Sequence, residues 1–151
     1  RADFAGHTPS RAEMLELTVW IRHRMAQEHR SEFHSDRLGR EDARWETFRE
    51  IAAGVAALSV GDPDDSLFLV FRPELVSTIY WGGDPTKTQA ARDFKGTINP
   101  RVSFETWSET VRGLSRRWEP YEQMGIRFLK DFVFDSLVRK ERTIQELAQR
   151  L

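Results

Sequence analysis

The chain has 151 residues, of which 39% are hydrophobic and 31% are charged, a composition typical of one globular domain rather than of a disordered segment. Its 23 Lys and Arg nearly balance its 24 Asp and Glu, so the net charge of -1 gives no reason to expect nucleic acid or an anionic membrane as a partner. The absence of cysteine excludes disulfides, thiolate zinc sites, thiol catalysis and thioether-linked cofactors within these residues.

The spacing of apolar residues predicts a first helix over about residues 9–28. Ser10 followed by Glu13 is the pattern of a capping box, which marks a helix start. The apolar side chains that would share one face are Met14, Leu17, Ile21 and Met25. The polar stretch 29–45 then predicts a loop with a short helical turn.

Three strands are predicted next. Residues 51–60 are small and apolar, as in a buried strand, and the segment 61–65 is rich in the Gly, Pro and Asp of turns. Residues 66–72 predict a second strand that pairs with the first as an antiparallel hairpin. β-branched and aromatic residues over 76–81 predict a third strand.

Residues 82–100 form a glycine- and proline-rich excursion from the sheet, and a loop of this length is more often functional than idle. The residues that follow fit two periods. A strand would align Arg101, Ser103, Glu105 and Trp107 on one face, and Val102 and Phe104 on the other. A helix, with Ser103 as its N-cap, would align Phe104, Trp107, Val111 and Leu114. The residues alone leave open a bistable element or an ordinary hairpin whose tryptophans cover the core.

Residues 119–151 predict one long helix. Apolar residues recur along it at alternating spacings of four and three, which is a heptad seam with one charged defect at Lys140. The seam residues are Val133, Leu137, Ile144, Leu147 and Leu151. We interpret this helix as a parallel dimer helix that continues into a following segment, the alternative being a helix packed on its own domain.

The sequence contains no recognisable pattern of a catalytic or metal site. Its four histidines are scattered without metal-ligand spacing, and we expect them to be solvated. The doublet Gly82-Gly83 lacks the Lys-Ser/Thr of a phosphate loop. We therefore expect a protein that is not an enzyme. With no membrane span, signal peptide or initiator Met, the chain is expected to be a cytoplasmic domain of a longer protein.

Three motifs in one stretch carry a family resemblance. They are Trp81-Gly82-Gly83, Pro100-Arg101-Val102-Ser103-Phe104 and Trp107-Ser108-Glu109. In sequence and separation they resemble the tongue of phytochrome PHY domains. Residues 6–10, 53–58 and 71–74 match segments of the same family in the same order, so the resemblance covers essentially the whole chain.

The resemblance implies an α/β (α+β) fold of GAF type, in which an antiparallel sheet is flanked by helices and a tongue hairpin protrudes. The PHY domain would occupy residues 1–118, without the family's first residues and early strand, and the tongue would span about 81–112. Residues 119–151 would be the long C-terminal signalling helix. In the family the tongue refolds between hairpin and helix when the bilin photoisomerises.

The family's contact residues can be placed on this sequence. Arg101 would pair with a carboxylate of the chromophore domain in one photostate, and Ser103 would hydrogen-bond it in the other. Trp81 and Trp107 would exchange packing places, and Gly82-Gly83 would allow close backbone approach. The remaining motif residues of this contact are Pro100, Phe104 and Glu109.

The implied cofactor is a biliverdin-type bilin held in the neighbouring GAF domain, not covalently by this chain. The implied partners are that domain, a C-terminal output module such as a kinase or nucleotide cyclase, and a second copy in a homodimer. Two other readings stay open: a GAF-like dimerisation or interaction module without light input, and a regulatory domain that binds a small molecule.

Overall fold

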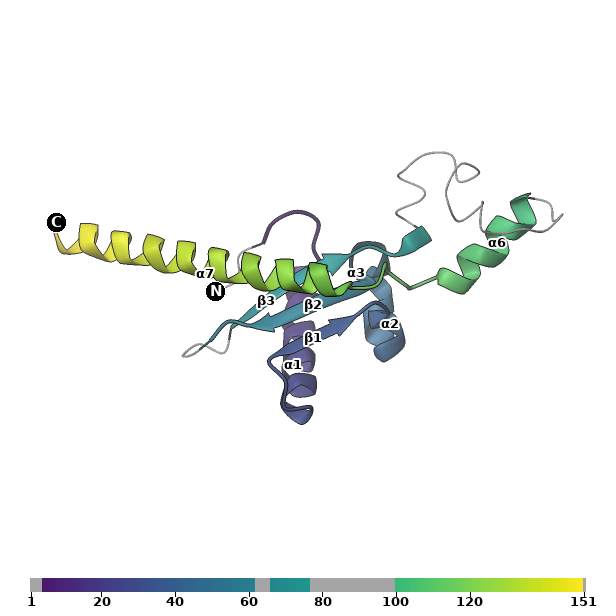
Figure 1. Ribbon diagram of the computed structural model, residues 1–151, viewed down its shortest axis with the longest axis horizontal. Coiled ribbons are helices and arrows are strands. Elements are labelled where there is room, and N and C mark those ends of the chain that lie inside the picture. Colours follow the sequence, from purple (N-terminus) through teal and green to yellow (C-terminus); the bar gives the residue numbers. More distant parts are fainter. Residues whose placement is uncertain (1–3, 62–65, 77–99, 151) are drawn as a thin grey trace.

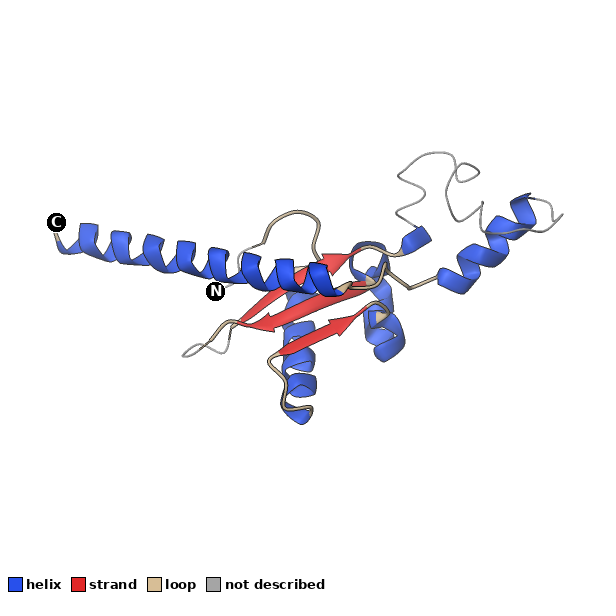
Figure 2. Cartoon of the chain, viewed as in Figure 1, coloured by secondary structure: helices blue, strands red, loops and turns tan. Residues whose placement is uncertain are grey.

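The computed structural model describes residues 4–61, 66–76 and 100–150, and for 100–104 the backbone alone. A three-stranded antiparallel sheet in the order β1-β2-β3 lies between α1 on one face and α7 on the other (Figures 1 and 2). This arrangement confirms the predicted α/β class with an antiparallel sheet flanked by helices.

The elements follow one another without long gaps until residue 76. In chain order they are α1 (Arg11–Gln27), β1 (Glu32–Ser35), α2 (Leu38–Glu41), the 3₁₀ helix η1 (Ala43–Phe48), α3 (Arg49–Ala52), β2 (Gly54–Ser59), β3 (Leu67–Arg72), α6 (Pro100–Val111) and α7 (Pro120–Gln149).

The start of α1 is fixed by its own side chains. Ser10 Oγ accepts a hydrogen bond from the Glu13 amide at 3.3 Å, and Glu13 Oε2 accepts one from the Ser10 amide at 2.7 Å. This reciprocal pair is the predicted capping box. The helix then buries Leu17, Ile21 and Met25, as their spacing predicted.

β2 is the central strand of the described sheet, and its first five residues are buried on both faces. Val55 and Ala57 face α1, together with a cluster of aromatic rings that includes Trp45. Ala56 and Leu58 face α7. β3 pairs with β2 over their whole length, so the predicted hairpin is confirmed. Every residue of β3 is half-buried, as befits the outer strand of the described sheet.

Three boundaries differ from prediction. β1 lies inside the stretch predicted as loop. The strand was not predicted because Phe33 is the only large apolar residue among its four residues. β2 begins at Gly54, since the preceding residues form α3. Val76, predicted to open a third strand, is helical, and residues 77–81 lie outside the described part. On β1, His34 is half-buried rather than solvated, and this burial lowers the pKa of its imidazole.

No helix in the described ranges combines the length and the apolar character that a membrane span requires.

Two leucines of α1 provide a matched test of the core. Leu17 is fully buried, so Leu17→Ala is expected to lower the free energy of unfolding by about 2–5 kcal/mol through lost burial and a residual cavity. Leu15 is 68% exposed on the same helix, and Leu15→Ala should change stability by no more than about 0.5 kcal/mol. Urea unfolding of the two variants measures both values. Equal losses would contradict the described packing of α1.

Candidate functional site

The connection between α6 and α7 is an irregular segment that hydrogen bonds and ion pairs hold along its length. We call residues 112–119 the strap. α6 points away from the sheet at the end where the strap lies, whereas α7 runs back along the sheet and continues beyond its other end (Figure 1). Any change in α6 can reach α7 along the chain only through the strap.

The α6 end of the strap is held by a buried carboxylate. Gly113 adopts φ 71°, a left-handed conformation that ends a helix and suits glycine. Its amide donates to Glu74 Oε2 at 3.0 Å. Glu74 is only 5% exposed, and a buried charge needs a partner, which Arg49 supplies through an ion pair at 3.4 Å. The start of the strap is thereby tied to the segment that follows β3.

A second cation caps the end of α6. Arg40 Nη2 donates to the carbonyl oxygens of Thr110 and Arg112, both at 3.2 Å. Thr110 lies in the last turn of α6 and Arg112 directly follows the helix, so both carbonyls lie at its C-terminal end, where backbone oxygens lack partners within the helix and the helix dipole is negative. Arg40 is exposed and lies on α2, so it joins two helices across the surface.

The middle of the strap lies against β2. The Ser115 amide donates to the Asp36 carbonyl at 2.7 Å, and the Leu75 amide donates to the Leu114 carbonyl at 2.7 Å. Ser115 is 3% exposed and packs directly on Gly54, where a Cβ atom would lie 2.1 Å from Ser115 Oγ. Glycine at position 54 is therefore required for this close approach.

Trp118 anchors the α7 end of the strap to the sheet. Its indole Nε1 donates to the Ser35 carbonyl at 3.0 Å, and its ring packs with Leu58 and Ile126 on the α7 face of the sheet. The guanidinium carbon of Arg72 lies 3.8 Å from the centre of this ring, a cation–π contact.

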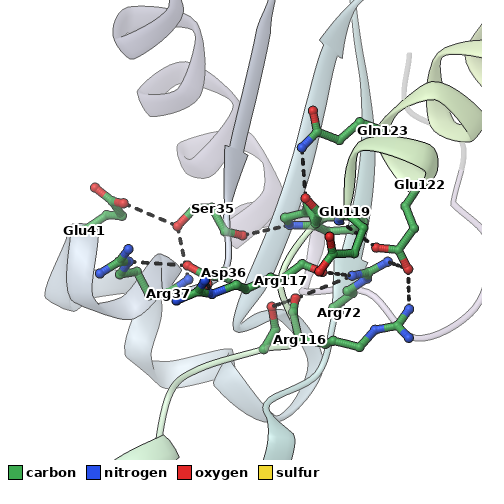
Figure 3. A network of polar contacts seen from close by, with 12 residues as sticks. Ser35, Asp36, Arg37, Glu41, Arg72, Arg116, Arg117, Glu119, Glu122 and Gln123 are labelled. Carbon is green, nitrogen blue, oxygen red and sulfur yellow. Dashed lines mark hydrogen bonds and ion pairs between the residues drawn. The ribbon is translucent and has the colours of Figure 1, made fainter.

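Arg72, the last residue of β3, connects the strap and α7 at once (Figure 3). Its Nη1 donates to the carbonyls of Arg116 at 3.4 Å and Arg117 at 2.8 Å, and its Nη2 pairs with Glu122 Oε1 at 2.8 Å. Glu122 also pairs with the Arg116 side chain and accepts from the Glu119 amide at 2.9 Å, which completes a capping box at the start of α7. The hydrogen bond from Arg72 is the main reason that the pKa of Glu122 lies below its ordinary value.

One further ion pair fastens α7 to the sheet away from the strap. Arg127 donates to both carboxylate oxygens of Glu32 on β1, at 2.5 and 2.7 Å. This hydrogen-bonded pair lowers the pKa of Glu32.

The predicted tongue residues fall partly outside the described chain. Trp81, Gly82 and Gly83 lie outside it, and the backbone of the motif Pro100-Arg101-Val102-Ser103-Phe104 is helical. Trp107 is half-buried and Glu109 is exposed, both on α6. Of the two periods in this segment, the structure has the helical one, so the second strand of the expected hairpin is not formed over Pro100–Val111. Ser103 lies within the helix and is not its N-cap, because α6 begins at Pro100.

The predicted dimer seam lies on an exposed part of α7. Leu137, Ile144 and Leu147 are 43%, 55% and 57% exposed, whereas Val133 is half-buried and Leu151 lies outside the described residues. Sequence reasoning missed a second apolar stripe on the first half of α7. Its members are Tyr121, Met124, Phe128 and Phe132, and all four are at least 62% exposed.

Sequence reasoning also missed the residues that hold the strap. They are Arg40, Arg72, Glu74, Gly113, Trp118 and Glu122. Gly113 was the accessible signal, since a glycine just past the last helical position marks a helix end. In the ranges that the structure covers, no group of three or more His, Asp or Glu side chains is arranged to hold a metal ion.

Comparison with known proteins identifies the family. The sequence model described as the phytochrome region, PHY, matches residues 2–142. The chain belongs to the PHY family. It is 29% identical to cyanobacterial phytochrome A of Nostoc sp. over 148 residues, which are 97% of this chain and 19% of the relative. It is 31% identical to a bacteriophytochrome of Xanthomonas campestris over 134 residues, which are 83% of this chain and 21% of the relative.

A solved structure agrees with this assignment. The PHY chain superposes on the crystal structure of a bacteriophytochrome from the photosynthetic bacterium R. palustris with a TM-score of 0.59 and 28% identity, covering 89% of this chain and 26% of the other. The chain thus spans about a fifth of the length of the curated relatives above, at 19% and 21%.

The lowered pKa of Glu122 makes a prediction about stability and pH. The ionised carboxylate stabilises the folded state at every pH above the pKa of an unfolded glutamate, about 4.3, and this contribution is lost as the pH falls through the lower pKa of the folded state. Glu122→Gln should therefore be less stable than the unaltered protein at neutral pH, and the difference should shrink as the pH falls below the pKa of an unfolded glutamate.

Thermal unfolding between neutral and acidic pH measures this difference. The matched control is Glu146→Gln, an exposed glutamate further along α7. Its unfolding temperature should follow that of the unaltered protein throughout. A destabilisation by Glu122→Gln that is the same at every pH would show that the carboxylate charge does not contribute.

Proposed function

We propose that this PHY domain is a non-enzymatic relay that passes a red/far-red light signal from a bilin-binding GAF domain to a C-terminal output module. The observation that supports it is the family match over residues 2–142 together with the continuous path from α6 through the strap to α7. The tongue receives the signal at one end of this path, and α7 delivers it at the other.

The signal enters as a conformational change of the tongue. The residues of α6 satisfy both a helical and a strand period, so two packings of one segment need to differ by only a few kcal/mol to act as a switch, about the range known for bistable elements. On α6 the helical period brings Trp107 and Val111 to one side, where both are half-buried, while Glu109 is exposed. Refolding to a strand would turn Trp107 and its neighbour 108 to opposite faces and so change the surroundings of the Trp107 ring.

The contact with the chromophore domain rests on Arg101 and Ser103. A guanidinium grips a carboxylate with directed, charge-assisted hydrogen bonds, and the pair gains strength when a docked domain shields it from water. Arg101 holds the carboxylate in one photostate and Ser103 in the other, while Trp81 and Trp107 exchange places. The bilin itself, of biliverdin type, resides in the GAF domain.

Arg101→Ala in the full-length protein that contains this chain tests the tongue contact. We expect one photostate to form less completely or to revert faster in the dark, with bilin still bound, because its ion pair with the GAF domain is gone. The photoconversion difference spectrum and the dark reversion rate measure both effects.

Arg112→Ala is the control for Arg101→Ala, since this arginine has an exposed side chain and lies just after α6. It should leave the spectrum and reversion unchanged. If Arg101→Ala also leaves both unchanged, the tongue does not report the state of the bilin, and it is better explained as a surface for another partner.

The signal leaves through α7 as part of a parallel homodimer. The seam residues Leu137, Ile144 and Leu147 are exposed beyond the sheet, where they can pack against the same residues of a second copy. Lys140 interrupts the seam, which weakens the helix pair and makes a change of register easier.

Leu137→Glu tests the dimer seam. A charge at a core position of a coiled coil is desolvated without a partner, so we expect the dimer to dissociate at concentrations where the unaltered protein stays dimeric. Sedimentation velocity of the full-length protein measures the change. Val138→Glu is the matched control, because this neighbouring apolar residue lies off the seam. Equal dissociation in both variants would contradict the seam.

A further inference from the structure

We infer that Arg72 is the positioning residue that transmits a change in α6 to α7, as the α7-side anchor of a segment, residues 72–75, that clamps both ends of the strap to the end of β3. This inference rests on the proposed relay and adds the residues that perform its mechanical step. The clamp consists of the short segment 72–75, with Arg40 supporting it from α2.

The segment 72–75 holds the strap at three successive points. Arg72 binds the α7 end through the carbonyls of 116 and 117, Glu74 binds the α6 end through the Gly113 amide, and the Leu75 amide binds the Leu114 carbonyl between them. Because these anchors are at most three residues apart in sequence, they move together. A displacement of the α6 end therefore displaces the anchor of the α7 end.

Arg72 is the member of the clamp that reaches α7 itself. Its guanidinium carbon lies over the Trp118 ring, at 3.8 Å from the ring centre, and its Nη2 pairs with Glu122 in the first turn of α7 at 2.8 Å. The Arg72 side chain is 18% exposed and that of Glu122 is 11% exposed, so water screens this pair less than a surface pair. The planar guanidinium of Arg72 binds a carboxylate and two carbonyls and also contacts an aromatic ring. A lysine ammonium cannot make all of these contacts with the same geometry.

The cap of α7 does not depend on Arg72. Without the guanidinium, Glu122 keeps its bond from the Glu119 amide and its pair with Arg116. Arg72→Gln therefore removes the link between β3 and α7 and leaves the start of the helix capped. This separation of roles allows transmission to be tested apart from folding.

The experiment is hydrogen–deuterium exchange of the full-length protein in the dark and after red illumination. We expect light to change the protection of α6 and α7 in the unaltered protein. In Arg72→Gln the light-induced change in α6 and the photoconversion spectrum should persist, while the change in α7 is largely lost. Arg72→Lys keeps the charge without the fork and should restore part of the α7 response.

Two more variants guard the result. Arg40→Gln removes the hydrogen bonds from an exposed side chain to the carbonyls of Thr110 and Arg112 at the end of α6, so it should also reduce the α7 response. If Arg72→Gln fails to fold, Arg40→Gln tests the clamp in its place. Arg127→Gln removes another arginine–glutamate pair between α7 and the sheet, outside the clamp, and should leave the light response of α7 in place.

The outcomes separate the clamp from the relay. If α6 responds to light and α7 responds equally in Arg72→Gln and in the unaltered protein, the clamp is overturned and the relay stands. An equal loss of the α7 response in Arg127→Gln overturns it too, since any fastening of α7 would then suffice. If α6 of the unaltered protein does not respond to light, the proposed relay fails and the clamp fails with it.

Discussion

The stacking of Arg72 on Trp118 is the contact on which the geometry of this domain depends most. One guanidinium satisfies strap carbonyls that no strand or helix would otherwise pair, neutralises the carboxylate that caps α7, and covers an indole that closes one face of the sheet. A cation–π contact shielded from water contributes about 2 kcal/mol, and its three polar bonds are made by the same rigid plane. One side chain therefore links β3, the strap and the first turn of α7, in addition to the Arg127–Glu32 pair that fastens α7 to β1.

The backbone of the strap depends on two residues without side chains. Gly54 lets Ser115 lie against β2 at a separation that a Cβ would block, and Gly113 turns the chain out of α6 with a positive φ. Small residues elsewhere on β2, such as Ala56 and Ala57, bring both layers of helix close to the sheet. Close packing of this kind leaves little free space between the strap, the sheet and the helices. A displacement of the strap therefore moves the neighbouring elements, because there is no empty volume to accommodate it.

Local patterns allowed much of the fold to be predicted, and long-range contacts account for what was not. The capping box at Ser10 and the apolar run of β2 act within a few residues, so the sequence displays them. β1 was missed because its buried Ser35 carries no apolar signal. The strap anchors were invisible for a different reason: Ser35, Asp36 and Arg117 accept through backbone carbonyls, which every residue has. At α6 two periods coincide, so periodicity could not choose the helix that the structure has.

The length of α7 has a mechanical consequence. At a rise of about 1.5 Å per residue, its 30 residues form an unbroken rod of about 45 Å, with its fixed end at Trp118 and most of its second half clear of the sheet. Such a rod acts as a lever arm. A tilt of about 5° at its fixed end carries its far end through about 4 Å, a distance comparable to the spacing between neighbouring seam residues on a helix.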